Sequence, residues 1–237
     1  MSKLAYSGAW QPQGPTPGTK KLQNLTIFDW DDTLFPTSAF TPRTEEEMMR
    51  IAANNKLLFS QLDLIVSGLL KRACQNQARV LIVTNAHKSW VDYSSQTLLP
   101  LTAELLKTQV LVISARAETP ATPATQWKIQ CFMQLFEQLK LKKDSVTNLV
   151  VVGDSMNEMN AGQRLAKSLP HCILKMIKMQ ETPQPRELLK QLVVINDSWD
   201  NICSATRNFN MKLERKQKKG EGDPAEENKN TRGNNSM

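Results

Sequence analysis

The chain has 237 residues, 40% of them hydrophobic and 22% charged, so one globular domain with tails is expected. The formal net charge of +7 is modest, and much of it lies in residues 212–219, so nucleic-acid binding is not expected. The sequence shows neither a secretory signal nor an apolar run of about eighteen residues. We therefore expect an intracellular protein that does not cross a membrane, cytoplasmic in the first place, with the nucleus and the mitochondrion left open.

The chain divides into three parts by composition. Residues 12–18 hold three prolines and two glycines, so residues 1–21 are expected to form a flexible leader. Residues 22–205 alternate short apolar runs with longer amphipathic ones and are expected to form the folded domain. Residues 206–237 are polar and partly basic, and this tail is expected to be disordered.

The predicted strands are short apolar runs that are rich in β-branched residues and do not alternate with polar ones. Such runs are typical of strands buried on both faces of a sheet. They are Leu25–Phe28, Val80–Val83, Val110–Ile113, Leu149–Val152 and roughly Cys172–Ile177.

Amphipathic segments with helical spacing separate these runs. They are Glu45–Cys74, residues 88–107 (in which Pro100 can begin a second helix), Trp127–Leu141, Met156–Leu169 and a final helix from Arg186. Alternating strands and helices predict an α/β fold, with a doubly wound parallel sheet in three layers. In such folds ligands bind at the carboxyl ends of the strands, so chemistry is expected just after each apolar run.

Acidic residues follow the first predicted strand directly. Asp29 and Asp31 are two positions apart, so in an extended chain both carboxylates point to one side. Like charges held this close favour a divalent cation between them, and Mg²⁺ binds carboxylates together with substrate phosphate. The alternative is that Asp31 and Asp32 cap the following turn.

Polar residues also follow the second strand and begin a later helix. The Thr84 hydroxyl and the Asn85 amide can hydrogen-bond phosphate oxygens, although either residue can equally cap the next helix. Lys128 opens a helix after a proline-rich connection, and by itself it is a weak signal because most lysines are solvent charges.

A second acidic pair follows the fourth strand. Gly153 allows close approach of the backbone to a ligand. Asp154 stands where a second metal-binding carboxylate is expected, and Glu158 lies one helical turn further on. The alternative is that Asp154 caps the helix.

Together these features resemble the four motifs of the haloacid dehalogenase (HAD) superfamily: Asp-x-Asp-x-Thr behind strand one, Ser or Thr behind strand two, a Lys on a later helix, and an acidic pair behind strand four. The resemblance spans residues 22 to about 205. The strings FDWDDTLFP, VTNAHKSWV, VISAR and WK are also similar to those of a group of HAD-like proteins from protists and other eukaryotes.

The resemblance implies a HAD-type, Rossmann-like fold and a magnesium-dependent phosphohydrolase. Asp29 would be the nucleophile that forms an aspartyl phosphate, and Asp31 the general acid and base. Mg²⁺ would be held by Asp29, Asp154 and the backbone carbonyl of Asp31, while Thr84 and Lys128 would bind the phosphoryl oxygens.

Two motif details refine this expectation. Thr33 ends the first motif and is expected beside the ligands, as is Glu158, which stands where the family often has Asp and would reach the metal through water. An acid at position 31 favours a phosphatase, because cation-pumping ATPases carry Thr there and dehalogenases lack the acid.

The space around the site bears on the substrate. Neither Leu34–Arg79 nor Ala86–Gln126 leaves room for a large cap domain, although a small helical cap within the first segment stays open. An uncapped site suits a phosphorylated macromolecule such as a protein, or a partner protein that acts as a lid. Arg116, after the third strand, is a candidate substrate contact, with a plain surface arginine as the alternative.

Two other readings compete with the enzyme. One is a catalytically silent HAD-fold scaffold or subunit of a larger assembly, and it is kept as the alternative. The other, a response-regulator receiver, would carry its phosphorylated Asp after the third strand, where this chain has Ser114, Ala115 and Arg116. We reject the receiver, and the oligomeric state stays open.

Overall fold

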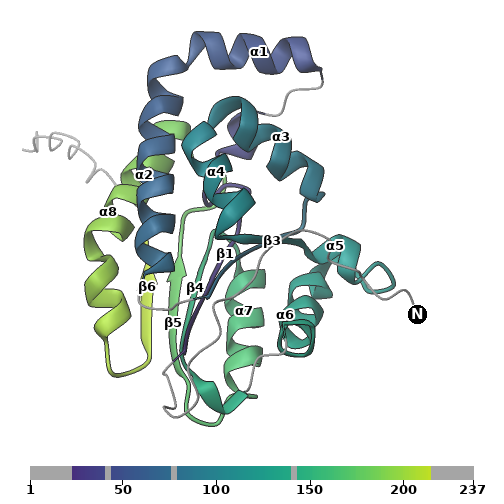
Figure 1. The fold of residues 1–237 in the computed structure, drawn as a ribbon, viewed down its shortest axis with the longest axis vertical. Helices are drawn as coiled ribbons and strands as arrows, with labels where there is room; N and C mark the ends of the chain where they lie inside the picture. The colour runs from purple at the N-terminus through teal and green to yellow at the C-terminus, as the bar shows by residue number, and fades with distance from the viewer. Residues whose placement is uncertain (1–22, 41–43, 76–78, 140–142, 215–237) are drawn as a thin grey trace, which may run out of the picture.

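Six parallel strands form one sheet in the computed structural model, which describes residues 23–40, 44–75, 79–139 and 143–214 (Figure 1). The strands lie in the order β3-β2-β1-β4-β5-β6, and each neighbouring pair is parallel. They are β1 (Gln23–Phe28), β2 (Arg79–Thr84), β3 (Leu111–Ser114), β4 (Val146–Gly153), β5 (Ile173–Lys178) and β6 (Phe209–Lys212). The expected α/β class with a parallel sheet is confirmed.

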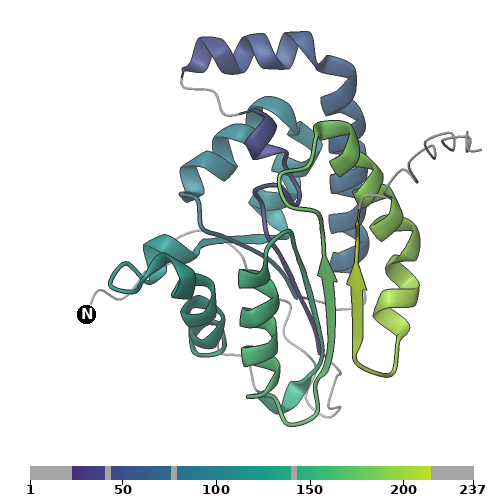
Figure 2. The same ribbon diagram turned by 180° about the vertical axis from the view of Figure 1, so that it is seen from behind.

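Helices cover both faces of the sheet, which gives three layers (Figures 1 and 2). One face carries α1 (Glu45–Asn54), α2 (Lys56–Cys74), α3 (Lys88–Leu98), α4 (Pro100–Thr108) and α8 (Pro185–Ser204). The other face carries α5 (Ala115–Glu118), α6 (Trp127–Gln138) and α7 (Met156–Ala166), and short 3-10 turns occur at Thr37–Ala39, Ala124–Gln126 and Lys143–Ser145. None of the helices in the described ranges is both long and apolar enough to cross a bilayer.

The predicted long helix from Glu45 is broken in two at Asn55. This residue leaves the helical conformation (φ −124°, ψ 26°), and its side-chain amide donates to the carbonyl of Ile51 at 3.0 Å. An amide that bonds a nearby carbonyl competes with helix continuation. As a result α1 turns away from the axis of α2 and lies over α3 (Figure 1). Residues 44–75 therefore form two packed helices and contain no separate domain.

The predicted helix start at Pro100 is confirmed, and a residue from another helix caps it. Asp63 of α2 is buried, and its carboxylate accepts from the backbone N–H groups of Leu101 and Thr102 and from the Thr102 hydroxyl, each at 2.8 Å. A carboxylate at this end satisfies free N–H groups and interacts favourably with the helix dipole.

The expected tail boundary at residue 206 is wrong, because Phe209–Lys212 form β6 beside β5. Phe209, Met211 and Leu213 are partly buried against the core, while Asn210 and Lys212 are exposed, as in an edge strand with one covered face. The helix before this strand, α8, lies on the same face as α2. The connection from β5 to β6 runs across the sheet in the opposite direction to the connection from β1 to β2, so the two crossovers have opposite hands. Crossovers between parallel strands are nearly always right-handed, so one of these two is an exception to that rule.

The centre of the sheet is its topological switch point. From β1 the chain moves to β2 and β3, then returns to β4 on the other side of β1. The ladder continues past the end of β1, because the Asp29 N–H donates to the Val152 carbonyl at 3.0 Å. The carboxyl ends of β1 and β4 therefore open side by side, where such folds bind ligands.

Candidate active site

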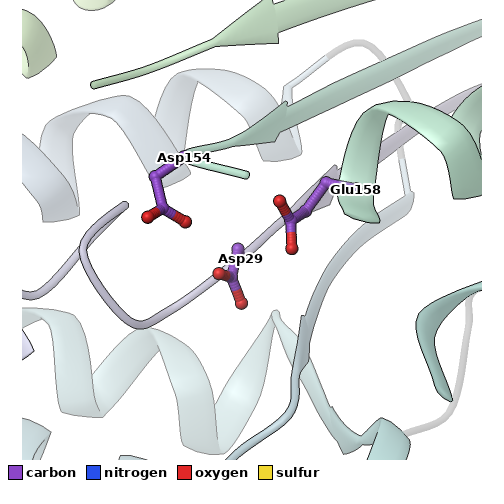
Figure 3. Close-up of side chains that lie close together, drawn as sticks. All are labelled: Asp29, Asp154 and Glu158. Atoms are coloured by element: carbon purple, nitrogen blue, oxygen red, sulfur yellow. The ribbon is translucent and has the colours of Figure 1, made fainter. Parts of the chain in front are cut away.

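Three carboxylates meet at the carboxyl ends of β1 and β4. Asp29 follows β1, Asp154 follows β4, and Glu158 lies in the first turn of α7. One oxygen from each lies within 4.8 Å of the others, and the three carboxyl groups face one another in Figure 3. Asp29 and Glu158 are 5% and 3% exposed, so this negative charge is largely removed from water.

Lys128, in the first turn of α6, is the cation of this cluster. Its ammonium lies 2.8 Å from Oδ1 of Asp29 and also contacts Oε1 of Glu158, and the residue is 3% exposed. Burial by itself would lower the pKa of Lys128, but the two carboxylates outweigh burial and raise it. Lys128 is therefore charged and joins two chain segments that sequence alone leaves unconnected.

The acids respond differently to this environment. Burial, with Glu158 and Asp31 nearby, raises the pKa of Asp29 well above its ordinary value in spite of Lys128. Burial, followed by repulsion from Glu158 and Asp32, raises the pKa of Asp154 to about 7. Burial would also raise the pKa of Glu158, but Lys128 and the Ser155 hydrogen bonds lower it. The single positive charge of Lys128 therefore does not offset burial for Asp29 and Asp154, whose pKa values stay raised.

Glycine at position 153 makes room for Glu158. A Cβ atom there would lie 2.4 Å from Cγ of Glu158, closer than atoms can approach. Glu158 also accepts from the Ser155 N–H at 2.9 Å and from its hydroxyl at 2.5 Å, forming a capping box at the start of α7. The carboxylate expected beside the metal ligands therefore lies inside the acid cluster itself.

The hydrogen-bond partners of Asp31 do not belong to this cluster. Its Oδ1 accepts from the Thr37 hydroxyl at 2.6 Å and from the Trp90 indole N–H at 3.0 Å, and its Oδ2 accepts from the Thr84 hydroxyl at 2.9 Å. The Thr84 hydroxyl in turn accepts from the N–H of Ala86 at 3.0 Å. The two Asp side chains of the first motif therefore have different partners and can do different chemistry.

The turn after the first motif uses the next acid for structure. Asp32 has a positive φ of 55°, and its carboxylate accepts from the N–H of Ser38 at 2.9 Å and contacts the Ser38 hydroxyl. The proposed capping role thus fits Asp32. Thr33 is fully buried, and its hydroxyl has no hydrogen-bond partner among the residues that the structure describes.

The two remaining candidate phosphate or substrate contacts lie at the same edge of the sheet. Asn85 follows β2 and is partly buried, with an Oδ1 atom that has no partner in the described part of the chain. Arg116 is exposed, and its guanidinium lies 5.6 Å from the centre of the Trp127 ring, next in the chain to Lys128. This cation–π contact holds a positive charge beside the start of α6, the helix that carries Lys128.

Sequence reasoning missed three residues that shape the site. Trp90 and Thr37 bind Asp31, and Lys178 at the end of β5 contacts the Asp154 carbonyl while it donates to that of Met179 at 3.0 Å. Neither Trp90 nor Thr37 lies directly behind a strand, so a search of strand ends passes over them. Lys178 is the last residue of β5, and a polar residue at that strand end is a signal that the sequence does contain.

The donor set fits a hard divalent cation. All three acids offer oxygen, the ligand that Mg²⁺ prefers, and the buried negative charge exceeds what Lys128 neutralises. No protein-family model, no curated protein and no solved structure matches this chain. The arrangement itself can bind a cation, present a carboxylate to an electrophile, and hold a second carboxylate for proton transfer.

Proposed function

We propose that this protein is a magnesium-dependent phosphohydrolase of the HAD type that acts through an aspartyl phosphate on Asp29. One observation carries the proposal: Asp29 lies with Asp154, Glu158 and Lys128 at the switch point of a parallel sheet. Asp31 stands two residues away with a hydrogen-bond network of its own. Nucleophile, charge partners and proton carrier are thus separate groups at one edge of the sheet.

Asp29, Asp154 and Glu158 would hold the Mg²⁺ ion, with the carbonyl of Asp31 as a further ligand by family resemblance. When bound, Mg²⁺ supplies positive charge that keeps these buried acids ionised and offsets the repulsion between an anionic nucleophile and an anionic substrate. Lys178 fixes the backbone that carries Asp154.

The chain's own groups carry the reaction. A carboxylate oxygen of Asp29 attacks phosphorus in line with the leaving oxygen, and Asp31 donates a proton to that oxygen as the bond breaks. Asp31 then takes a proton from the water that hydrolyses the aspartyl phosphate. The Lys128 ammonium, the Thr84 hydroxyl and the Asn85 amide bind the phosphoryl oxygens and stabilise the negative charge that is spread over them in the transition state.

The substrate we favour is a phosphorylated macromolecule such as a phosphoprotein. In the described residues, the segments after β1 and after β2 consist of packed helices and turns, without a separate cap domain. A site without a cap domain would admit a phosphate that projects from a large surface. Arg116, held over Trp127 at the start of α6, would contact an anionic group next to that phosphate.

The test is hydrolysis of p-nitrophenyl phosphate with Mg²⁺ and with EDTA, using the wild type, Asp29→Asn and Asp197→Asn. Asp197 lies exposed on α8 and serves as the matched control. We expect Mg²⁺-dependent turnover by the wild type and the control, and none above background by Asp29→Asn. Comparable turnover by Asp29→Asn would remove Asp29 from the mechanism.

A silent scaffold is the second candidate, and one observation favours it. Glu158 completes the capping box of α7 and forms an ion pair with Lys128, so both residues also stabilise the fold. Under this alternative the wild type binds Mg²⁺ in calorimetry yet turns over neither aryl phosphates, sugar phosphates nor phosphopeptides.

A further inference from the structure

We propose that Trp90 is a positioning residue for the proton carrier. Together with Thr37, its indole holds one oxygen of Asp31, so that the other oxygen exchanges the proton with the leaving group. This inference rests on the proposed function and assigns a role within it to a helix residue outside the acid motifs.

The two oxygens of Asp31 have unequal partners. Oδ1 accepts two hydrogen bonds, from Trp90 at 3.0 Å and Thr37 at 2.6 Å. Oδ2 accepts one from the described residues, from Thr84 at 2.9 Å. Thr84 is also the hydroxyl expected to bind phosphate. When its hydrogen turns to the phosphate, Oδ2 is released while Oδ1 stays held, and the two oxygens take different roles.

The aromatic packing makes Trp90 a fixed donor. Its ring lies edge-on to Phe35, with centres 5.9 Å apart and planes at 82°. Phe35 in turn stacks on Trp30 at 6.0 Å and on Phe59 of α2 at 6.1 Å. A hydroxyl can rotate away from its acceptor, whereas this indole cannot without disturbing several rings. A hydrogen bond to a carboxylate is also stronger than one between neutral groups.

The proposed step uses this arrangement directly. As the bond from Asp29 to phosphorus forms and the ester bond breaks, the proton on Oδ2 of Asp31 moves to the leaving oxygen, which departs as an alcohol. Asp31 is left as a carboxylate and regains a proton from the attacking water, while inorganic phosphate leaves and Asp29 is restored. A misplaced Oδ2 slows the reaction most where the leaving oxygen is strongly basic and needs the proton.

The experiment compares Trp90→Phe with Trp30→Phe on two substrates, an alkyl phosphate and p-nitrophenyl phosphate. Trp30 is the matched control, because its indole belongs to the same aromatic cluster but donates its hydrogen bond to Ser94, at 3.2 Å, and not to Asp31. We expect Trp90→Phe to lower kcat for the alkyl phosphate by about tenfold, as loss of one hydrogen bond predicts, with KM unchanged and p-nitrophenyl phosphate within about twofold. Trp30→Phe should change both substrates by one common factor.

The outcomes separate this inference from the proposed function. Equal losses on both substrates by Trp90→Phe, or no loss, would overturn the positioning role while leaving the phosphatase in place. Absence of turnover by the wild type on both would overturn the proposed function and this role with it.

A second measurement needs no turnover and does not depend on the stability of Trp90→Phe. In ¹H–¹⁵N spectra of the full chain, Asp31→Ala should shift the indole N–H signal of Trp90 and speed its solvent exchange. The solvent exchange of the Trp30 indole should change much less, because that N–H keeps its hydrogen bond to Ser94. An unchanged Trp90 signal would overturn the inference by itself.

Discussion

Replacing Asp154 by Asn should make the metal-free protein more stable at alkaline pH. Burial and repulsion by Glu158 raise the pKa of Asp154 from 3.8 to about 7. An acid whose pKa is higher in the folded state binds more protons when folded, so the free energy of unfolding falls as pH rises through the window from 3.8 to about 7. The Asn variant lacks this slope.

The size of the effect follows from the pKa shift. Between about pH 5 and about pH 8 the window covers some two pH units, and about 1.36 kcal/mol for each gives about 2.7 kcal/mol. Asp154 is partly exposed, and solvent screening reduces this figure. We therefore expect the stability of Asp154→Asn, relative to the wild type, to increase by about 1 to 3 kcal/mol between the two pH values.

Urea denaturation at both pH values measures this difference, first in EDTA and then with millimolar Mg²⁺. With Mg²⁺ the order should reverse at high pH, because a cation that binds only the folded wild type stabilises it and the variant has lost a ligand. Asp197→Asn, an exposed acid on the same protein, should show no such pH-dependent difference. A difference between Asp154→Asn and the wild type that is the same at both pH values would refute the reasoning.

Three further predictions test the surroundings of the site. Lys128→Met leaves Asp29 and Glu158 buried without their cation and should lower the free energy of unfolding in EDTA by about 3 to 5 kcal/mol. Calorimetry should show tighter Mg²⁺ binding by this variant, and unchanged stability would contradict the ion-pair geometry. Gly153→Ala forces a Cβ against Glu158 and should cost about 1 to 3 kcal/mol and weaken Mg²⁺ binding, whereas Gly68→Ala, with open space around its Cβ, should do neither. Asp63→Ala removes the cap of α4 and should cost about 1 to 3 kcal/mol in urea denaturation without changing Mg²⁺ affinity; a change in that affinity would show that this cap reaches the site.

Much of the fold could be predicted because the central strands are buried on both faces. Runs such as Leu149–Val152 are short and apolar without alternation, a pattern typical of strands that are buried on both faces of a parallel sheet. The break at Asn55 could not be read from hydrophobic spacing, since the apolar pattern continues across it and one side-chain hydrogen bond decides the conformation. The strand β6 was missed because its alternation is short and borders a polar tail.

For the candidate site, the sequence could predict which residues lie at the strand ends, but not which side chains contact one another there. Asp29 and Asp154 could be placed from strand ends alone, because parallel strands present their carboxyl ends at one edge. The inward turn of Glu158 depends on a glycine contact and a capping box, and the hydrogen bond from Trp90 depends on how α3 packs against the aromatic cluster. Interactions of this kind exist only once distant segments have been brought together.

The pairing of Phe28 with Val152 has a consequence for how the protein can vary. Adjacent strands lie about 4.8 Å apart, a separation that one small ion between two carboxylates can span. Asp29 follows this pair directly and Asp154 follows it by two residues, so the register of the two strands fixes where both acids leave the sheet, whatever the length of the connections between them. Insertions in those connections should leave the pair intact, whereas a slip of one residue between β1 and β4 would turn one acid away and separate them.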